Sequence, residues 1–165
     1  MKRPTNIRIR YTEDYPAELG YIGDKKSDWI DLYTAETVTL QAGEYALISL
    51  GVAMQLPDGV EANIVPRSST FKNYGVLQAN SMGVIDNTYC GDNDIWKFPA
   101  YATRDITIPK GTRICQFRLN YTMRTEFGEI KFEPVISLGN ADRGGFGSSG
   151  KKSKKREFER TTVFL

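Results

Sequence analysis

The residues between Val65 and Asp86 concentrate the chemistry of this chain. Arg67 offers a planar fork of donors that matches phosphate oxygens, and Ser68 and Ser69 beside it add neutral donors. Asp86, which closes the stretch, could hold or deprotonate a water molecule. Together these residue types predict a site for a phosphate-bearing ligand that water attacks.

Each of these signals has a plain structural alternative when it is taken alone. Arg67, Ser68 and Ser69 could be a helix cap beside a surface arginine. The glycine-rich segment 139–150 could be a backbone nest for phosphate or a flexible linker. Asp86 could simply open a turn, and Gln116 could be a polar residue on the outer face of a strand.

The absence of histidine from the sequence narrows the possible chemistry. It excludes Ser-His-Asp and Cys-His nucleophile systems and zinc sites built on histidine. Proton transfer would therefore depend on a carboxylate or on water. Carboxylates prefer hard cations, so Mg²⁺ is the expected metal if one is used.

The length of the chain predicts one domain, and its small net charge predicts no strong overall electrostatic field. The 165 residues, 40% of them hydrophobic, suffice for one core of ordinary size, and the net charge is +2. Cys90 and Cys115 lack metal-site spacing, and we expect buried, reduced thiols. Nothing resembles a signal peptide or a membrane span, so we expect a cytoplasmic protein with no membrane partner.

The elements that must position these residues follow from a period-two pattern of apolar residues, which predicts an all-β fold: a sandwich, jelly roll or barrel. Pro57-Asp58-Gly59 predicts a tight reversal that makes a hairpin. We expect one short helix over 68–74, capped by Ser68 or Ser69 and ended by Gly75, with backbone N–H groups at its start that could face an anion. The expected strands cover 7–11, 45–56, 60–65, 101–108, 113–119 and 130–135.

Five ordered segments of the chain resemble the five motifs of the trimeric dUTP diphosphatases (dUTPases). The resemblance spans about residues 28–150, and the amino-acid sequence of these segments is most similar to that of the subgroup found in Gram-positive bacteria and their phages. The segments are D-W-I-D-L-Y-T-A-E (28–36), P-R-S-S-T-F-K-N-Y-G (66–75), N-S-M-G-V-I-D-N-T-Y-C-G-D (80–92), G-T-R-I-C-Q-F (111–117) and D-R-G-G-F-G-S-S-G (142–150).

The resemblance implies a distorted jelly-roll (β-clip) subunit that forms a homotrimer, with each active site built from three chains. It implies hydrolysis of dUTP to dUMP and pyrophosphate, which supplies the precursor of dTMP and limits uracil in DNA. The chain would divide into a β core over 1–138, a glycine-rich arm over 139–150 that covers phosphate and base, and a basic extension over 151–165.

The resemblance also implies a role for each site residue. Asp86 would hold the attacking water and act as general base at the α-phosphorus. Mg²⁺ would bridge triphosphate oxygens largely through water, with Asp31 as an outer-shell partner and Asp28 able to share that role. Uracil and deoxyribose would contact Asn80, Gly83, Val84, Ile85, Tyr89 and Phe146, whereas the phosphates would contact Arg67, Ser68, Ser69, Gln116, Arg143, Ser148 and Ser149.

The sequence departs from the family pattern in three places. Two residues are missing between Arg143 and Phe146, and the segment 92–98 is extra. We therefore hypothesise that Ile95, Trp96 or Phe98 helps to cover the uracil, the alternative being that Trp96 packs in the core. The tail 151–165 could be a solvated extension, could pack on another subunit, or could touch nucleic acid through the basic residues of 151–160; nucleic acid is otherwise not an expected partner.

Two other functions stay open at the level of the sequence. One is a dCTP deaminase, a relative in fold, against which the intact motif from Asn80 to Tyr89 argues. The other is a regulatory protein that binds another protein in a nucleotide-dependent way on the same trimer. A dual role is compatible with every motif above.

Overall fold

The structure is a computed structural model that describes residues 6–13, 15, 19, 28–129, 131–137 and 139. The chain divides into two units, Met1–Ile130 and Lys131–Leu165. Every strand of the described residues belongs to the first unit. The strands that carry the predicted residues up to Gln116 therefore all lie in the first unit.

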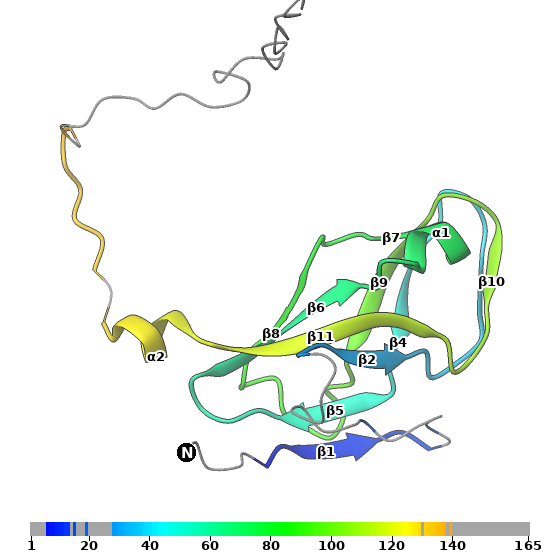
Figure 1. Ribbon diagram of the computed structural model, residues 1–165, viewed down its shortest axis with the longest axis horizontal. Coiled ribbons are helices and arrows are strands. Elements are labelled where there is room, and N and C mark those ends of the chain that lie inside the picture. The colour runs from blue at the N-terminus through cyan, green and yellow to red at the C-terminus, as the bar shows by residue number, and fades with distance from the viewer. Residues whose placement is uncertain are drawn as a thin grey trace, which may run out of the picture. The chain divides into compact units, whose positions relative to one another are not determined.

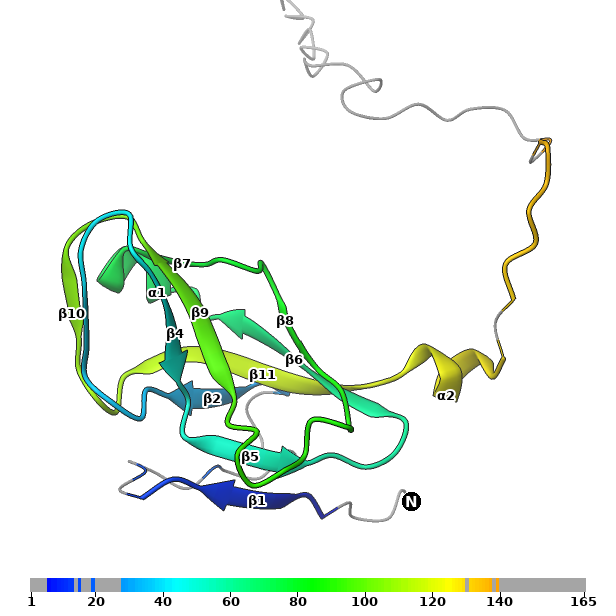
Figure 2. The same cartoon turned by 180° about the vertical axis from the view of Figure 1, so that it is seen from behind.

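Two antiparallel sheets form the body of the first unit (Figure 1). One has the strand order β2 (Ile30–Tyr33), β11 (Arg113–Tyr121), β6 (Val60–Pro66) and β8 (Gly83–Ile85). The other has the order β4 (Tyr45–Ser49), β9 (Lys97–Ala102) and β7 (Val76–Gln78). Two further pairs join β1 (Arg8–Tyr11) to β5 (Val52–Gln55) and β10 (Ile106–Ile108) to β3 (Val38–Leu40), the former side by side in both views (Figure 2). The predicted all-β, jelly-roll architecture is confirmed.

The hydrophobic core lies between these sheets because alternate residues of each strand point inward. Leu32, Ile64 and Phe117 come from the first sheet, and Ile48 and Phe98 come from the second; all five are almost completely buried. The buried core supports the outer faces of both sheets, where polar side chains can be presented.

The apolar stretch 45–56 forms two strands instead of one, and the predicted hairpin with 60–65 is wrong. The chain bends at Gly51, whose φ is 63°. The reversal at Pro57–Gly59 is present, with the Val60 N–H donating to the Pro57 carbonyl at 3.2 Å. However, β5 pairs with β1, whereas β6 pairs with β11 and β8. The turn therefore carries the chain from one sheet to another, and long-range packing decides the pairing.

Two other strand predictions need correction. The segment 101–108 is interrupted, since β9 ends at Ala102 and β10 begins at Ile106. Residues 131–135 form no strand. Phe132 in this segment and Ile136 just after it are almost fully exposed. A strand requires a hydrogen-bonded neighbour, and none of the described strands pairs with this segment.

The described residues contain two short helices, where the sequence predicted one. Helix α1 (Thr70–Tyr74) ends at Gly75 in the left-handed conformation, as expected. Ser69 is at the N-cap position, but its side chain makes no capping hydrogen bond. Helix α2 (Met123–Phe127) was not expected. None of the helices in the described ranges has the length and apolar character needed to cross a bilayer.

Candidate active site

Three predicted phosphate and metal residues meet at one end of the four-stranded sheet. Gln116 on β11 is in register with Asp31 on β2 and with Val65 on β6. Residues in register share a face, and Arg67 comes two positions after Val65 in the chain. The Arg67 Nε lies 2.9 Å from the Asp31 Oδ1. We call Arg67, Ser68, Ser69, Gln116 and Asp31 the clamp.

A buried threonine fixes the loop that carries the clamp arginine. The Thr70 hydroxyl donates to the Ile114 carbonyl of β11 at 2.6 Å and accepts from the Arg67 N–H at 3.1 Å. The Thr70 N–H donates to the Arg67 carbonyl at 3.0 Å. Ser68 is exposed and Ser69 half-buried in the turn between β6 and α1. The loop is thus tied to the strand that carries Gln116.

The predicted base-reading segment is a tight bend between β7 and β8. Ser81 has a positive φ of 62°, which is uncommon for a residue with a side chain, and the Met82 N–H donates to the Asn80 carbonyl at 2.6 Å. A Cβ on Gly83 would lie 3.1 Å from the Ile64 Cβ, so glycine lets β8 approach β6 closely. Asn80 and Val84 are exposed, and Ile85 is half-buried.

Asp86 stands immediately after β8 in an Asx turn. Its Oδ1 accepts hydrogen bonds from the Thr88 hydroxyl and, at 2.7 Å, from the Thr88 N–H. These two bonds, that of the hydroxyl first, lower the pKa of the fully exposed Asp86 carboxyl below its ordinary value. The carboxylate is exposed and can hold a water, but its lowered pKa makes it a weak base.

Asp86 and the clamp lie at opposite ends of their strands. Ile85 is in register with Ala62, which precedes Arg67 by five residues along β6. Asp86 follows Ile85 on this antiparallel strand and so lies one residue further from Arg67, at the level of Glu61. At a rise of about 3.3 Å per residue, this places the backbones of Asp86 and Arg67 of one chain about 20 Å apart along the strand. The structure therefore brings the clamp together and separates it from the predicted catalytic aspartate.

The remaining predicted residues have mixed outcomes. Tyr89 is 39% exposed, and its hydroxyl donates to the Ile95 carbonyl at 3.5 Å. Trp96 and Phe98 are fully buried, with Trp96 packed edge-on against Phe117 at 5.3 Å between ring centroids. The hypothesis that either covers the uracil is therefore wrong, whereas for the half-buried Ile95 it stays a prediction. Arg143, Phe146, Ser148, Ser149 and the tail 151–165 lie outside the described residues.

Sequence reasoning missed three residues that support the site. Thr70 anchors the clamp loop, and Arg113 places its Nη1 3.5 Å from the Asp31 Oδ2. Gln78, which is 8% exposed, donates from Nε2 to the Asn80 Oδ1 at 3.0 Å. Gln78 could have been found from the pattern V-L-Q, which places a polar residue at an inward position of a strand.

The described residues of the clamp include a single carboxylate, that of Asp31, that could face a metal ion. Among the described residues no three histidine, cysteine or acidic side chains gather closely enough to hold a metal ion. Asp31 is one carboxylate flanked by two arginines, and Asp28 is exposed nearby in the chain. This arrangement fits an ion that arrives with the triphosphate and meets the protein in its outer shell.

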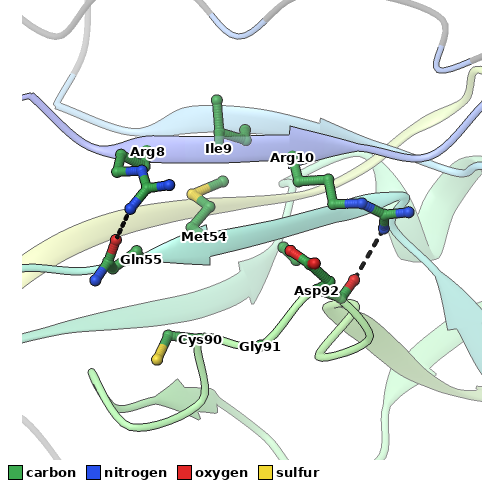
Figure 3. A pocket seen from close by; sticks show the side chains of 9 residues that line it. Arg8, Ile9, Arg10, Met54, Gln55, Cys90, Gly91 and Asp92 are labelled. Atoms are coloured by element: carbon green, nitrogen blue, oxygen red, sulfur yellow. Dashed lines mark hydrogen bonds between the residues drawn. The ribbon is translucent and has the colours of Figure 1, made fainter.

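A pocket of about 290 Å³ is lined by β1, β5 and the segment 90–92, and none of the clamp residues lines it (Figure 3). Its two arginines are engaged: Arg8 donates to the Gln55 side chain at 3.1 Å and Arg10 to the Asp92 carbonyl at 2.8 Å. Cys90 lines it and is exposed, so the expectation of a buried thiol is wrong there. The expectation of a buried, reduced thiol is confirmed for Cys115, where burial raises the pKa of the thiol.

Comparisons with known proteins agree with this geometry. The family model described as dUTPase matches residues 22–150. The chain is 52% identical over 146 residues to the SPbeta prophage-derived deoxyuridine 5'-triphosphate nucleotidohydrolase YosS of Bacillus subtilis, covering 88% of this chain and 99% of that one.

Two solved structures of phage proteins share the fold. A phage 80alpha dUTPase variant superposes with a TM-score of 0.70 at 19% identity, covering 89% of this chain and 100% of that one. A variant of the dUTPase from phage phi11 of S. aureus, described with a structural Mg(II) ion, gives 0.65 at 17% identity, covering 81% and 99%. The chain belongs to the dUTPase family and is similar to Gram-positive bacterial and phage members of that family.

Proposed function

We propose that this protein hydrolyses dUTP to dUMP and pyrophosphate. The observation that carries the proposal is the strand register that gathers Arg67, Gln116 and Asp31 on one face of the sheet, with the Asn80–Asp86 segment ordered on the same sheet. The 52% identity to a deoxyuridine triphosphate nucleotidohydrolase supports it. The product dUMP would serve as precursor of dTMP, and removal of dUTP would limit uracil in DNA.

Base recognition would fall to the bend at Asn80. The Asn80 amide and nearby backbone groups would pair with the polar edge of uracil, because a base with another donor pattern would leave buried groups unpaired. Gly83, Val84 and Ile85 would form the strand floor of this pocket. Tyr89, whose ring is partly exposed, would lie beneath the sugar.

Phosphate recognition and water activation would be separate tasks. The guanidinium of Arg67, the hydroxyls of Ser68 and Ser69 and the amide of Gln116 would hold triphosphate oxygens. Mg²⁺ would neutralise triphosphate charge, with Asp31 in its outer shell and Asp28 as a possible second carboxylate. Asp86 would aim a water at the α-phosphorus, and positioning and charge neutralisation would contribute more than proton abstraction. Arg143, Phe146, Ser148 and Ser149 would complete the site from the arm.

We further propose a homotrimer with shared sites. The separation of about 20 Å between the backbones of Asp86 and Arg67 supports sites formed by different chains, since one α-phosphorus cannot be close to Asp86 of a chain while its triphosphate lies in the same chain's clamp. The side chains of Phe132, Val135 and Ile136 are exposed in the single chain and would be covered by a neighbouring subunit.

The test of the activity is pyrophosphate release from dUTP, dCTP and UTP by the wild type and by Asp86→Asn. We expect rapid release from dUTP alone and its loss in the variant. Absence of dUTP hydrolysis by the wild type would overturn the function, whereas hydrolysis that survives in Asp86→Asn would overturn only the role of Asp86. Preferential deamination of dCTP would indicate the relative in fold.

A regulatory role is the second candidate. The phage 80alpha dUTPase with which this chain shares its fold is described through the link between its enzymatic activity and an inducing capacity. A partner that recognises the nucleotide-bound trimer would bind differently in the presence of a non-hydrolysable dUTP analogue. The partner itself and a contact of the tail 151–160 with nucleic acid remain predictions.

A further inference from the structure

Gln78 is a polar side chain that is buried beside the bend at Asn80. It ends strand β7, where Val76 and Gln78 point inward. Its side chain is 8% exposed, and its Nε2 donates two hydrogen bonds, to the Ile64 carbonyl at 3.1 Å and to the Asn80 Oδ1 at 3.0 Å. Its Oε1 is buried with no hydrogen-bond partner among the described residues.

The Ile64 carbonyl determines the orientation of the Gln78 amide and, through it, that of the Asn80 amide. A backbone carbonyl can only accept, so the Gln78 amide must turn its NH₂ group toward Ile64. The second hydrogen of that NH₂ group then points at Asn80, so Asn80 must accept this hydrogen bond with its side-chain oxygen Oδ1. The orientation of the Asn80 amide is therefore set by a backbone group that cannot rotate.

This orientation matters because an asparagine amide reads two opposite hydrogen-bond patterns. Uracil presents the N3–H donor beside the O4 acceptor, whereas cytosine presents the N3 acceptor beside the amino donor. An amide with Oδ1 and Nδ2 side by side can pair with either edge if it flips by 180°. Held by Gln78, Asn80 keeps one order: Oδ1 has a second lone pair for the uracil N3–H, and Nδ2 can donate to O4.

We propose that Gln78 is a positioning residue that locks the Asn80 amide in the order that reads uracil and thereby excludes cytosine. The inference rests on the proposed function. An apolar side chain at position 78 would avoid a buried unpaired oxygen, which is costly. The hydrogen bond from Gln78 to Asn80 explains why a glutamine occupies this position.

The test compares Gln78→Met with the wild type, because methionine has a similar volume and length but cannot donate. With the lock removed, both amide orientations become accessible. We expect kcat/KM for dUTP to fall about twofold through KM, while kcat/KM for dCTP rises at least about fivefold, the worth of one hydrogen bond of ordinary strength. A general loss of structure would lower both values together.

Two controls separate a positioning role from a structural one. Val76→Ala removes a buried side chain from the same strand and should destabilise the protein without changing the dUTP-to-dCTP ratio. In an Asn80→Ala background, Gln78→Met should no longer alter that ratio, because the amide it orients is gone. A wild-type ratio in Gln78→Met would overturn the inference, and so would an altered ratio that persists without Asn80. Wild-type protein inactive on dUTP would instead overturn the proposed function.

Discussion

Asp86 illustrates how local hydrogen bonds define what a carboxylate can do. Its Asx turn with Thr88 lowers its pKa, which keeps it ionised and weakens it as a base. In the proposed reaction it is therefore best suited to holding a water in line with the α-phosphorus. The rate would come largely from the clamp, which neutralises charge on the phosphates.

Substitution Thr88→Val tests the origin of this pKa. It removes the side-chain hydrogen bond and leaves the backbone one, so the pKa of Asp86 should rise toward the ordinary aspartate value of about 3.9. Because the folded pKa is depressed, the stability that this carboxylate contributes is present above the unfolded pKa and is lost as pH falls through the folded one. Carboxyl ¹³C titration by NMR measures the shift, and an unchanged midpoint would contradict the assignment.

Substitution Arg67→Lys tests the need for a planar fork in the clamp. Lysine keeps the charge but cannot reproduce bidentate contacts, so we expect KM for dUTP to rise about 10- to 100-fold. Arg124→Lys is the matched control, since Arg124 forms an exposed ion pair with Asp58 at 2.9 Å, and steady-state kinetics compares the two. Equal KM values in both variants would remove Arg67 from the phosphate site.

At this scale the sequence predicted the residues with exposed chemistry better than those that hold them. Arg67 and Asp86 could be predicted from residue type, order and resemblance. The inward position of Gln78 could have been inferred from the pattern V-L-Q, but its role and that of Thr70 could not, because these roles depend on carbonyls of Ile64 and Ile114 that are distant in the chain. Such contacts exist only after the strands have paired.

Secondary-structure elements determine which of these residues meet. Strands β2, β11 and β6 run side by side, and their register aligns Asp31, Gln116 and Val65. The period-two pattern predicted the strands but not the pairing of β5 with β1, because ladders between distant segments are decided by packing. The missed helix α2 is short and carries no buried residue among those the structure describes, so it left no apolar pattern to read.

Substitution Thr70→Val tests the anchor between the clamp loop and β11. Valine has the same shape but leaves the Ile114 carbonyl and the Arg67 N–H without partners, and we expect a loss of about 2–4 kcal/mol in the free energy of unfolding. Thr39→Val is the control, because the Thr39 hydroxyl bonds Thr107 at 3.0 Å on an exposed surface. Urea unfolding measures both, and similar losses in the two would contradict the anchor.

Substitution Trp96→Phe tests whether the extra segment 92–98 packs in the core. The smaller ring should leave a gap against Phe117 and lower the free energy of unfolding by about 1–3 kcal/mol, with KM for dUTP unchanged. Thermal unfolding and kinetics on the same sample check this. Wild-type stability together with a raised KM would restore a role in covering the base.

For the whole molecule, the separation of the clamp from Asp86 is the observation with the largest consequence. One chain places the backbones of Arg67 and Asp86 about 20 Å apart along β6, so the proposed reaction would need the clamp and the aspartate from different chains. The resemblance to the trimeric dUTPases already implied active sites shared between chains, but motif order gives no physical reason for it. The strand register supplies that reason, because it separates the two groups of residues within one chain.

Mixing two inactive variants tests this central claim most directly. We expect Arg67→Ala and Asp86→Asn each to inactivate every site in their own homotrimer. In trimers assembled from equal amounts of both, about a quarter of the sites would combine an intact Arg67 with an intact Asp86 from another chain. The account predicts dUTP hydrolysis in the co-assembled sample at about a quarter of wild-type activity. Activity no greater than that of the separate variants, in trimers shown to contain both chains, would contradict it.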